Sequence, residues 1–137
     1  METYRGLVMA QEVDSNGHMN VQYYTTRYDM ASGQLMAYLG IDFTKMKAAQ
    51  KGFAYVEMNI RYIREVLEDD PIHIETKVLA CSRKVVTIFH TLKNSLTGEV
   101  ASTAEAKWVV LDKVARRADL LDEEVRQKLE ALIEVED

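Results

Sequence analysis

Four stretches in the middle of the chain alternate apolar and polar residues, and only short turns separate them. They cover residues 54–63, 72–80, 84–93 and 100–111. A period of two places the apolar side chains on one face of a β-strand. Turns this short favour antiparallel neighbours, because a parallel pair needs a long crossover. The sequence therefore predicts an antiparallel sheet with one buried face.

A long helix is predicted ahead of these strands. Its apolar residues recur every three or four positions, at Val21, Tyr24, Tyr28, Ala31, Leu35, Tyr38 and Leu39. Either Asn16 or Asn20 can cap its start, and Gly40 stands where a glycine commonly ends a helix. Because it is the only long helix, we expect it to cover the apolar face of the sheet.

The two ends of the chain add one predicted element each. Residues 4–13 have a mixed, strand-like pattern, and Asp122 is a good cap for a closing helix over 123–133. The predicted fold is α+β: an antiparallel sheet of five strands wrapped around one long central helix, with a C-terminal helix. We expect a single domain over 1–137, because this length corresponds to one domain.

Composition excludes several classes of protein. The chain has 17 Lys and Arg against 22 Asp and Glu, and a net charge of −5 does not favour nucleic acid as a partner. No apolar run reaches the roughly 18–20 residues of a membrane helix, so no membrane partner is expected. The single Cys81 cannot form an internal disulfide, and it is expected to pack rather than to react. We therefore expect a cytoplasmic protein.

No cofactor or metal site is predicted. The three histidines lack metal-ligand spacing, and the chain has no glycine-rich nucleotide loop and no Gly-x-Ser-x-Gly motif. One of them, His90, lies on the apolar register of its strand. It is expected to be a hydrogen-bonded histidine of the core or of an interface.

The stretch from 14 to 24 carries the chemical information. It places Asp14, Asn16, His18 and Asn20 within seven residues, directly ahead of the long helix. A turn followed by a helix cap explains the Asp, Asn and Gly residues, but it gives no reason for His18. The alternative is a site for acyl hydrolysis. The unpaired N–H groups of a helix start stabilise an oxyanion, and a nearby carboxylate attacks the carbonyl or deprotonates water.

The residues also resemble those of a known family. The pattern Asp-x-x-Gly-His-x-Asn, with Tyr24 four residues after Asn20, resembles the hotdog-fold acyl-thioesterases, most closely the hydroxybenzoyl-CoA type. The predicted order of elements is also that family's order, so the resemblance covers nearly the whole chain. It implies an acyl-CoA thioester hydrolase that works as a homodimer or homotetramer.

A second pattern is similar to that of the plant acyl-carrier-protein thioesterases. They carry Asp-x-Asn-x-His ahead of the helix and an Arg-Glu pair at the end of the next strand, here Arg64 and Glu65. The catalytic residues that the resemblance implies are Asp14, Asn16, His18 and Glu65. The substrate-binding residues that it implies are Gly17, Asn20, Val21 and Tyr24. Asp14 would attack or activate water, and the N–H of Val21 or a neighbour would hold the oxyanion.

Three other functions stay open at this point. The chain can be a thioesterase for acyl-carrier-protein rather than acyl-CoA. It can be a non-catalytic hotdog module that binds acyl-CoA, although the carboxylate at Asp14 favours an enzyme. It can also be a hotdog lyase, a class that usually places its histidine and acid differently.

Overall fold

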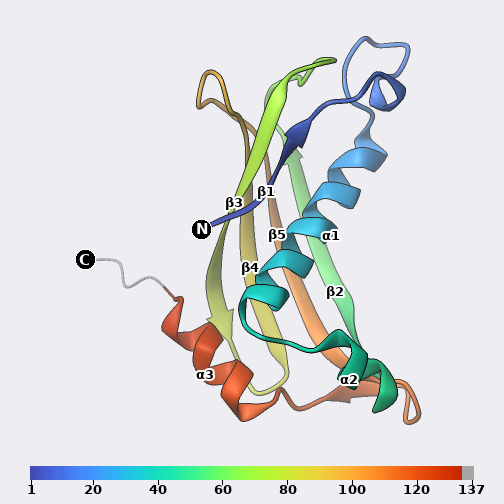
Figure 1. Cartoon of the computed structure of the whole chain (residues 1–137), viewed down its shortest axis with the longest axis vertical. Coiled ribbons are helices and arrows are strands. Elements are labelled where there is room, and N and C mark those ends of the chain that lie inside the picture. The colour runs from blue at the N-terminus through green and yellow to red at the C-terminus, as the bar shows by residue number, and fades with distance from the viewer. Residues whose placement is uncertain (134–137) are drawn as a thin grey trace. The chain divides into compact units, whose positions relative to one another are not determined.

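The computed structural model describes residues 1–133 (Figure 1). The elements, in chain order, are β1 (Glu2–Leu7), the short 3₁₀ helix η1 (Ala10–Glu12), α1 (Val21–Tyr38), α2 (Phe43–Ala48), β2 (Lys51–Tyr62), β3 (Pro71–Cys81), β4 (Val85–Asn94), β5 (Val100–Asp112), β6 (Arg117–Asp119) and α3 (Glu123–Ala131). The strands form one sheet in the order β1-β3-β4-β5-β2, and β6 pairs with β5. The predicted combination of sheet, long helix and C-terminal helix is confirmed.

Four details differ from the sequence prediction. The sheet has six strands rather than five, because three-residue β6 is too short to show a period. The first strand ends at Leu7 instead of 13, since η1 interrupts the extended backbone. The short helix α2 was not predicted. The closing helix ends at Ala131 rather than 133.

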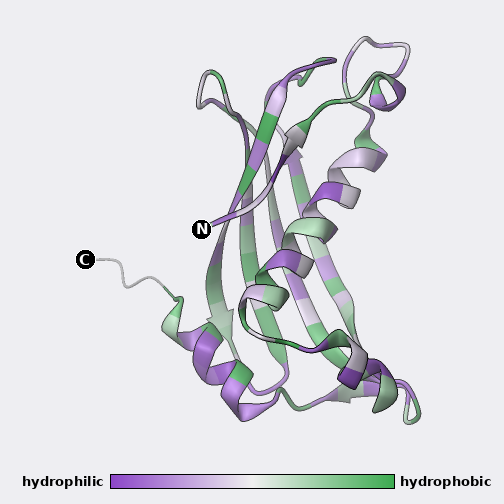
Figure 2. Cartoon of the chain, viewed as in Figure 1, coloured by the Kyte–Doolittle hydropathy of each residue, from purple (hydrophilic) through white to green (hydrophobic). Residues whose placement is uncertain are grey.

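Alternating burial supports the predicted strand faces. β1 pairs antiparallel with β3, with Gly6 opposite Ile72. Along β4, every second side chain is buried, and Figure 2 shows the alternation of hydropathy along the strands. β2 does not follow this alternation, because it lies at the edge of the strand order. Its residues Val56 and Tyr62, expected on the buried face, are 58% and 51% exposed.

Contacts divide the chain into two compact units. The first unit comprises 1–35, 60–76 and 90–104, and the second comprises 36–59, 77–89 and the residues from 105 onward. Within the described residues 1–133, no helix is long and apolar enough to cross a membrane.

A polar cluster lies in the core of the first unit. The fully buried His90 ring bonds Ser32 Oγ through Nε2 at 3.1 Å and Thr76 Oγ1 through Nδ1 at 2.7 Å. The ring of Tyr28 stacks on it, with 5.3 Å between the ring centroids. The expected role of His90 as a hydrogen-bonded core residue is therefore confirmed.

Aromatic packing and helix caps organise the second unit. The Phe53 ring lies edge-on to Trp108, with 5.0 Å between centroids. Gly40 has a φ of +80° at the end of α1, as its position in the sequence predicted. Lys128 Nζ donates to the carbonyl of Leu39 at 3.0 Å. A side chain of α3 thus supplies a hydrogen-bond donor to a carbonyl group at the end of α1.

Candidate active site

A tight turn brings the predicted catalytic residues together in the first unit. The N–H of Asp14 donates to the carbonyl of His18 at 3.1 Å, and the N–H of Gly17 donates to the carbonyl of Asp14 at 3.0 Å. Gly17 has a φ of +84°, a conformation that residues with a Cβ rarely adopt. The turn closes between Val13 and Met19, which form an isolated antiparallel bridge.

A buried ion pair fixes the turn to the long helix. Arg27 of α1 makes a forked contact with the carboxylate of Glu12, and the two side chains are only 6% and 9% exposed. The same guanidinium donates to the carbonyl of Leu7 at 3.1 Å. Burial opposes ionisation of Glu12, but hydrogen bonds from Arg27 and Met9 outweigh it and lower the pKa of this carboxyl. Sequence reasoning missed this pair, since neither residue stands in a recognisable motif.

The Asp14 carboxylate is held ionised by donors from its own loop. Its Oδ1 accepts the backbone N–H of Asn16 at 2.8 Å, and its Oδ2 accepts the side-chain amide of Asn20 at 3.0 Å. Both bonds lower the pKa of Asp14, and the bond from Asn16 has the larger effect. Asn16 thus contributes its backbone N–H to the site.

The first turn of α1 has an unused donor at Val21. The side-chain oxygen of Asn20 accepts the N–H of Gln22 at 3.1 Å, and the Asn20 carbonyl accepts the N–H of Tyr23 at 3.1 Å. Across residues 1–133, the N–H of Val21 donates to no protein group. An unpaired N–H at a helix start can stabilise an oxyanion.

His18 adds an acceptor to the site. Its Nδ1 lies 3.2 Å from the carbonyl of Met19, and a carbonyl only accepts hydrogen bonds. This contact favours the tautomer with the proton on Nδ1, in which Nε2 can accept a hydrogen bond.

A pocket of about 360 Å³ opens at the start of α1. It is lined by His18, Met19, Val21, Tyr24, Tyr62, Ile63, Arg64 and Glu65. Four of the predicted site residues, at 18, 21, 24 and 65, therefore meet in one pocket. The other four, Asp14, Asn16, Gly17 and Asn20, form the turn next to His18 and do not line the pocket. The sequence motifs did not include Tyr62, which the sequence indicated only as one residue of the predicted strand over 54–63.

Hydrogen bonds on both sides hold Glu65 in place. The N–H of Arg64 donates to the carbonyl of Ala101 at 3.0 Å, and the carbonyl of Val66 accepts the N–H of Met19 at 2.9 Å. In the described part of the chain, the Glu65 carboxylate bonds neither Asp14 nor any other group. Its predicted support of Asp14 therefore involves no direct contact in this structure.

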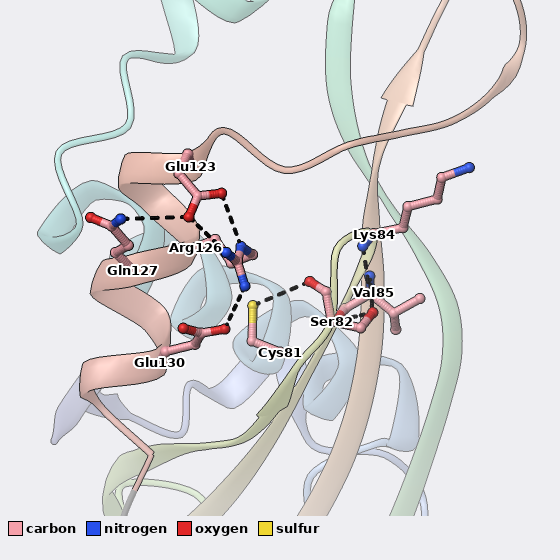
Figure 3. Close-up of polar contacts among 8 residues, drawn as sticks. All are labelled: Cys81, Ser82, Lys84, Val85, Glu123, Arg126, Gln127 and Glu130. Carbon is pink, nitrogen blue, oxygen red and sulfur yellow. Dashed lines mark hydrogen bonds and ion pairs between the residues drawn. The ribbon is translucent and has the colours of Figure 1, made fainter.

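The other reactive groups of the chain are less suited to catalysis. A cavity of about 650 Å³ lies in the second unit, and two of the charged groups that line it, Lys51 and Asp119, pair with each other. Figure 3 shows Cys81 near Arg126 and Glu130 of α3, with its thiol 3.6 Å from the carbonyl of Ser82. Burial, followed by the Glu130 charge, raises the pKa of this thiol, which opposes thiolate formation. Residues 1–133 contain no cluster of three or more side chains suited to a metal ion.

Comparisons with known proteins identify the family. The family model of the thioesterase-like superfamily matches residues 8–129. The betainyl-CoA thioesterase of Pseudomonas aeruginosa is 27% identical over 134 residues, which cover 98% of this chain and 84% of that protein. An L-carnitine dehydrogenase/betainyl-CoA thioesterase of a Rhizobium species is 28% identical over 127 residues, or 93% of this chain. The chain spans only 25% of that longer relative.

Solved structures show the same fold. A Staphylococcus aureus protein, solved in complex with CoA, superposes with a TM-score of 0.89 at 17% identity, covering 100% of this chain and 89% of that one. The family match and this fold together show that the chain belongs to the thioesterase-like superfamily. The predicted hotdog fold and thioester hydrolysis of acyl-CoA are confirmed at the level of the family.

Proposed function

We propose that Asp14 drives acyl-CoA hydrolysis at the edge of the pocket at the start of α1, which the turn of Asp14 adjoins through His18. The observation that carries the proposal is the Asp14 carboxylate, which accepts two hydrogen bonds beside a helix start with an unpaired N–H at Val21. A carboxylate that stays ionised at neutral pH is available as a base or nucleophile. The residues that complete the proposed site are Asn16, Gly17, His18, Asn20, Tyr24 and Glu65.

The proposed reaction breaks the thioester C–S bond and forms a C–O bond. The carbonyl oxygen of the substrate accepts the N–H of Val21, so that negative charge developing on this oxygen is stabilised. Asp14 either removes a proton from the attacking water, which Nε2 of His18 helps to orient, or attacks the carbonyl itself. In both routes the products are a carboxylic acid and CoA, and the departing thiolate regains a proton from the solvent or the acid. No metal and no cofactor takes part.

The two routes for Asp14 differ in where a labelled oxygen goes. If Asp14 attacks the carbonyl, water enriched in ¹⁸O hydrolyses an aspartyl anhydride at the aspartyl carbon, and label enters the Asp14 carboxyl. If Asp14 acts as a base, label enters only the released acid. Label in the peptide that contains Asp14, detected by mass spectrometry after repeated turnovers, therefore identifies attack by Asp14, whereas label in the acid alone fits either a base or hydrolysis of the anhydride at the acyl carbon.

The deciding experiment compares Asp14→Asn with the wild type on a panel of acyl-CoAs. The panel includes betainyl-CoA, named for the Pseudomonas aeruginosa relative, and short, long, branched and aromatic acyl groups. Asn keeps the turn chemistry but is neither base nor nucleophile, so we expect kcat to fall about 10²–10⁴-fold. A folded variant that retains activity within about threefold of the wild type would contradict the proposal.

A matched control makes the same change in another turn. Asp112 accepts the N–H groups of Val114 and Ala115 at 3.0 and 3.1 Å, so its side chain also holds a turn. Asp112→Asn is expected to leave turnover unchanged. The same panel presented on acyl-carrier-protein tests the alternative carrier, and a chain that binds acyl-CoA but turns over no substrate would be the non-catalytic module.

We further propose a cytoplasmic homodimer or homotetramer. The cytoplasm fits a chain with one unpaired cysteine, because disulfides form in oxidising compartments. Assembly is supported by the edge strand β2, which exposes Val56 and Tyr62, with Ile63 directly after it. An apolar strand edge that lacks cover favours pairing with another strand.

A further inference from the structure

Two aromatic rings form a corner in the pocket at the start of α1. The rings of Tyr24 and Tyr62 are perpendicular, with an interplanar angle of 90° and 4.9 Å between their centroids. At this distance the edge of one ring packs against the face of the other, so a ligand meets the pair from its exposed side. Tyr24 is 3% exposed and Tyr62 is 51% exposed, so the Tyr24 ring is packed in the interior and the Tyr62 ring lies at the surface.

An uncompensated negative charge lies in the same pocket. Glu65 lines it, and within residues 1–133 its carboxylate has no ion pair or hydrogen bond. Arg64 also lines the pocket, but its guanidinium lies 3.2 Å from the Glu99 carboxylate, which balances its charge. Burial is the main cause that raises the pKa of Tyr24 to about 12, and Tyr62 adds to it; Arg27 lowers this pKa, and the Glu65 charge makes the smallest contribution.

Ring faces and one carboxylate suit a specific kind of ligand. The faces of aromatic rings carry negative electrostatic potential and attract cations, and a quaternary ammonium binds there because its methyl groups make no hydrogen bonds. The remaining lining is partly apolar, with Met19 and Ile63 in contact with the pocket. A neutral acyl group would gain from the apolar lining but not from the charge of Glu65.

We propose that Tyr24, Tyr62 and Glu65 select acyl-CoA substrates whose acyl group ends in a quaternary ammonium. The inference rests on the proposed thioesterase function of Asp14, whose turn adjoins this pocket through His18. Tyr62 contacts the methylated cation with its exposed ring face, the buried Tyr24 ring holds Tyr62 in place, and Glu65 supplies the opposite charge. The thioester carbonyl then lies toward Val21, which lines the same pocket.

The test compares two substrates that differ in one atom. In betainyl-CoA a trimethylammonium group is joined to the acyl CH₂, and in 3,3-dimethylbutanoyl-CoA a carbon replaces the nitrogen and the charge is lost. After division by the uncatalysed hydrolysis rate of each thioester, because the cationic nitrogen itself activates the carbonyl, we expect kcat/KM of the wild type to be about tenfold or more higher for betainyl-CoA, which is the scale of a partly desolvated cation–π contact. An aromatic substrate, benzoyl-CoA, is measured beside them.

Variants then test the assigned residues through the ratio of the two kcat/KM values. Tyr62→Leu and Glu65→Gln should each lower the ratio several-fold, whereas Tyr62→Phe keeps a ring face and should preserve it. The controls are Tyr38→Leu, at an exposed position near the end of α1, and Glu68→Gln, in the turn that follows the pocket; both should keep the wild-type ratio. Tetramethylammonium should inhibit the wild type competitively, and Tyr62→Leu should weaken this inhibition.

Each failure has a distinct meaning. A wild-type ratio near one, or a preference for benzoyl-CoA, overturns the cation pocket while the thioesterase function stands. A high ratio that survives in both Tyr62→Leu and Glu65→Gln overturns the assignment of these residues. An enzyme that hydrolyses no acyl-CoA of any kind overturns the proposed function and this inference together.

Discussion

The side-chain amide of Asn20 joins two tasks, because its nitrogen donates to Asp14 Oδ2 at 3.0 Å while its oxygen accepts the N–H of Gln22 at 3.1 Å. The first bond holds the proposed catalytic carboxylate, and the second caps α1. A single residue therefore ties the ionisation of Asp14 to the position of the helix start. Substitutions at 20 can separate the two tasks.

Asn20→Asp is expected to keep the cap and to disturb Asp14. Aspartate caps a helix as well as asparagine does, so the melting temperature should change little. A second carboxylate beside Asp14 replaces a donor with a like charge, which raises the pKa of Asp14. The acidic limb of the pH–rate profile should therefore move to higher pH.

Asn20→Ser is the matched comparison, because serine keeps the cap and adds no charge. It removes the donated bond, so its acidic limb should move less than that of Asn20→Asp. If the profiles of both variants overlay that of the wild type, Asp14 is not the group that titrates in catalysis.

The buried pair of Glu12 and Arg27 predicts a large effect on stability. Glu12→Gln leaves the Arg27 guanidinium without a counter-charge at a position where the side chain is 6% exposed. Removing one partner of a buried pair typically costs about 3–5 kcal/mol, and urea unfolding should detect this loss. The exposed pair of Glu2 and Arg5 provides the control, since Glu2→Gln should not change the midpoint measurably. An unchanged midpoint for Glu12→Gln would contradict the predicted role of the pair.

The sequence predicted the helices and strands whose apolar residues recur at regular spacing, and it missed those without such a repeat. The alternation along 84–93 matched β4 because one face of that strand is buried, and the spacing of Tyr24, Tyr28 and Leu35 matched α1. β6 is only three residues long, and η1 interrupts the expected strand over 4–13, so neither produced a readable pattern.

The same distinction applies to the candidate site. Asp14, His18 and Asn20 are close in sequence, so a motif is enough to identify them. Tyr62 and Arg27 reach the site through tertiary packing, from the end of β2 and the middle of α1. Local sequence carries no information on such contacts. The backbone bond from Asn16 to Asp14 was also hidden, because it depends on the geometry of the turn.

The buried His90 predicts a pH dependence of stability. Burial lowers its pKa from 6.5 to about 4 in the folded protein. Between these values the unfolded chain binds a proton that the folded chain does not, so stability is fully present above pH 6.5 and falls as the pH drops toward 4. A shift of this size corresponds to a loss of about 3 kcal/mol.

The control for this prediction is His90→Gln. Glutamine can still bond Ser32 and Thr76 but does not titrate, so its free energy of unfolding should change less between pH 6.5 and 4. Urea unfolding at half-unit pH steps provides the comparison. Parallel curves for the wild type and the variant would mean that other groups cause the acid sensitivity.

The edge strand β2 predicts assembly in solution. We expect light scattering at micromolar concentration to give a mass near two or four times the 15.7 kDa of one chain. Val56 and Ile63 are 58% and 55% exposed, and a lysine at either position opposes strand pairing by adding charge at the edge. Val56→Lys and Ile63→Lys should therefore reduce the mass toward that of a monomer. Leu96→Lys, at a turn residue that is 80% exposed, should leave the assembly intact. A monomeric wild type would contradict the proposed assembly, and a multimer that resists both edge substitutions would place the interface on another surface.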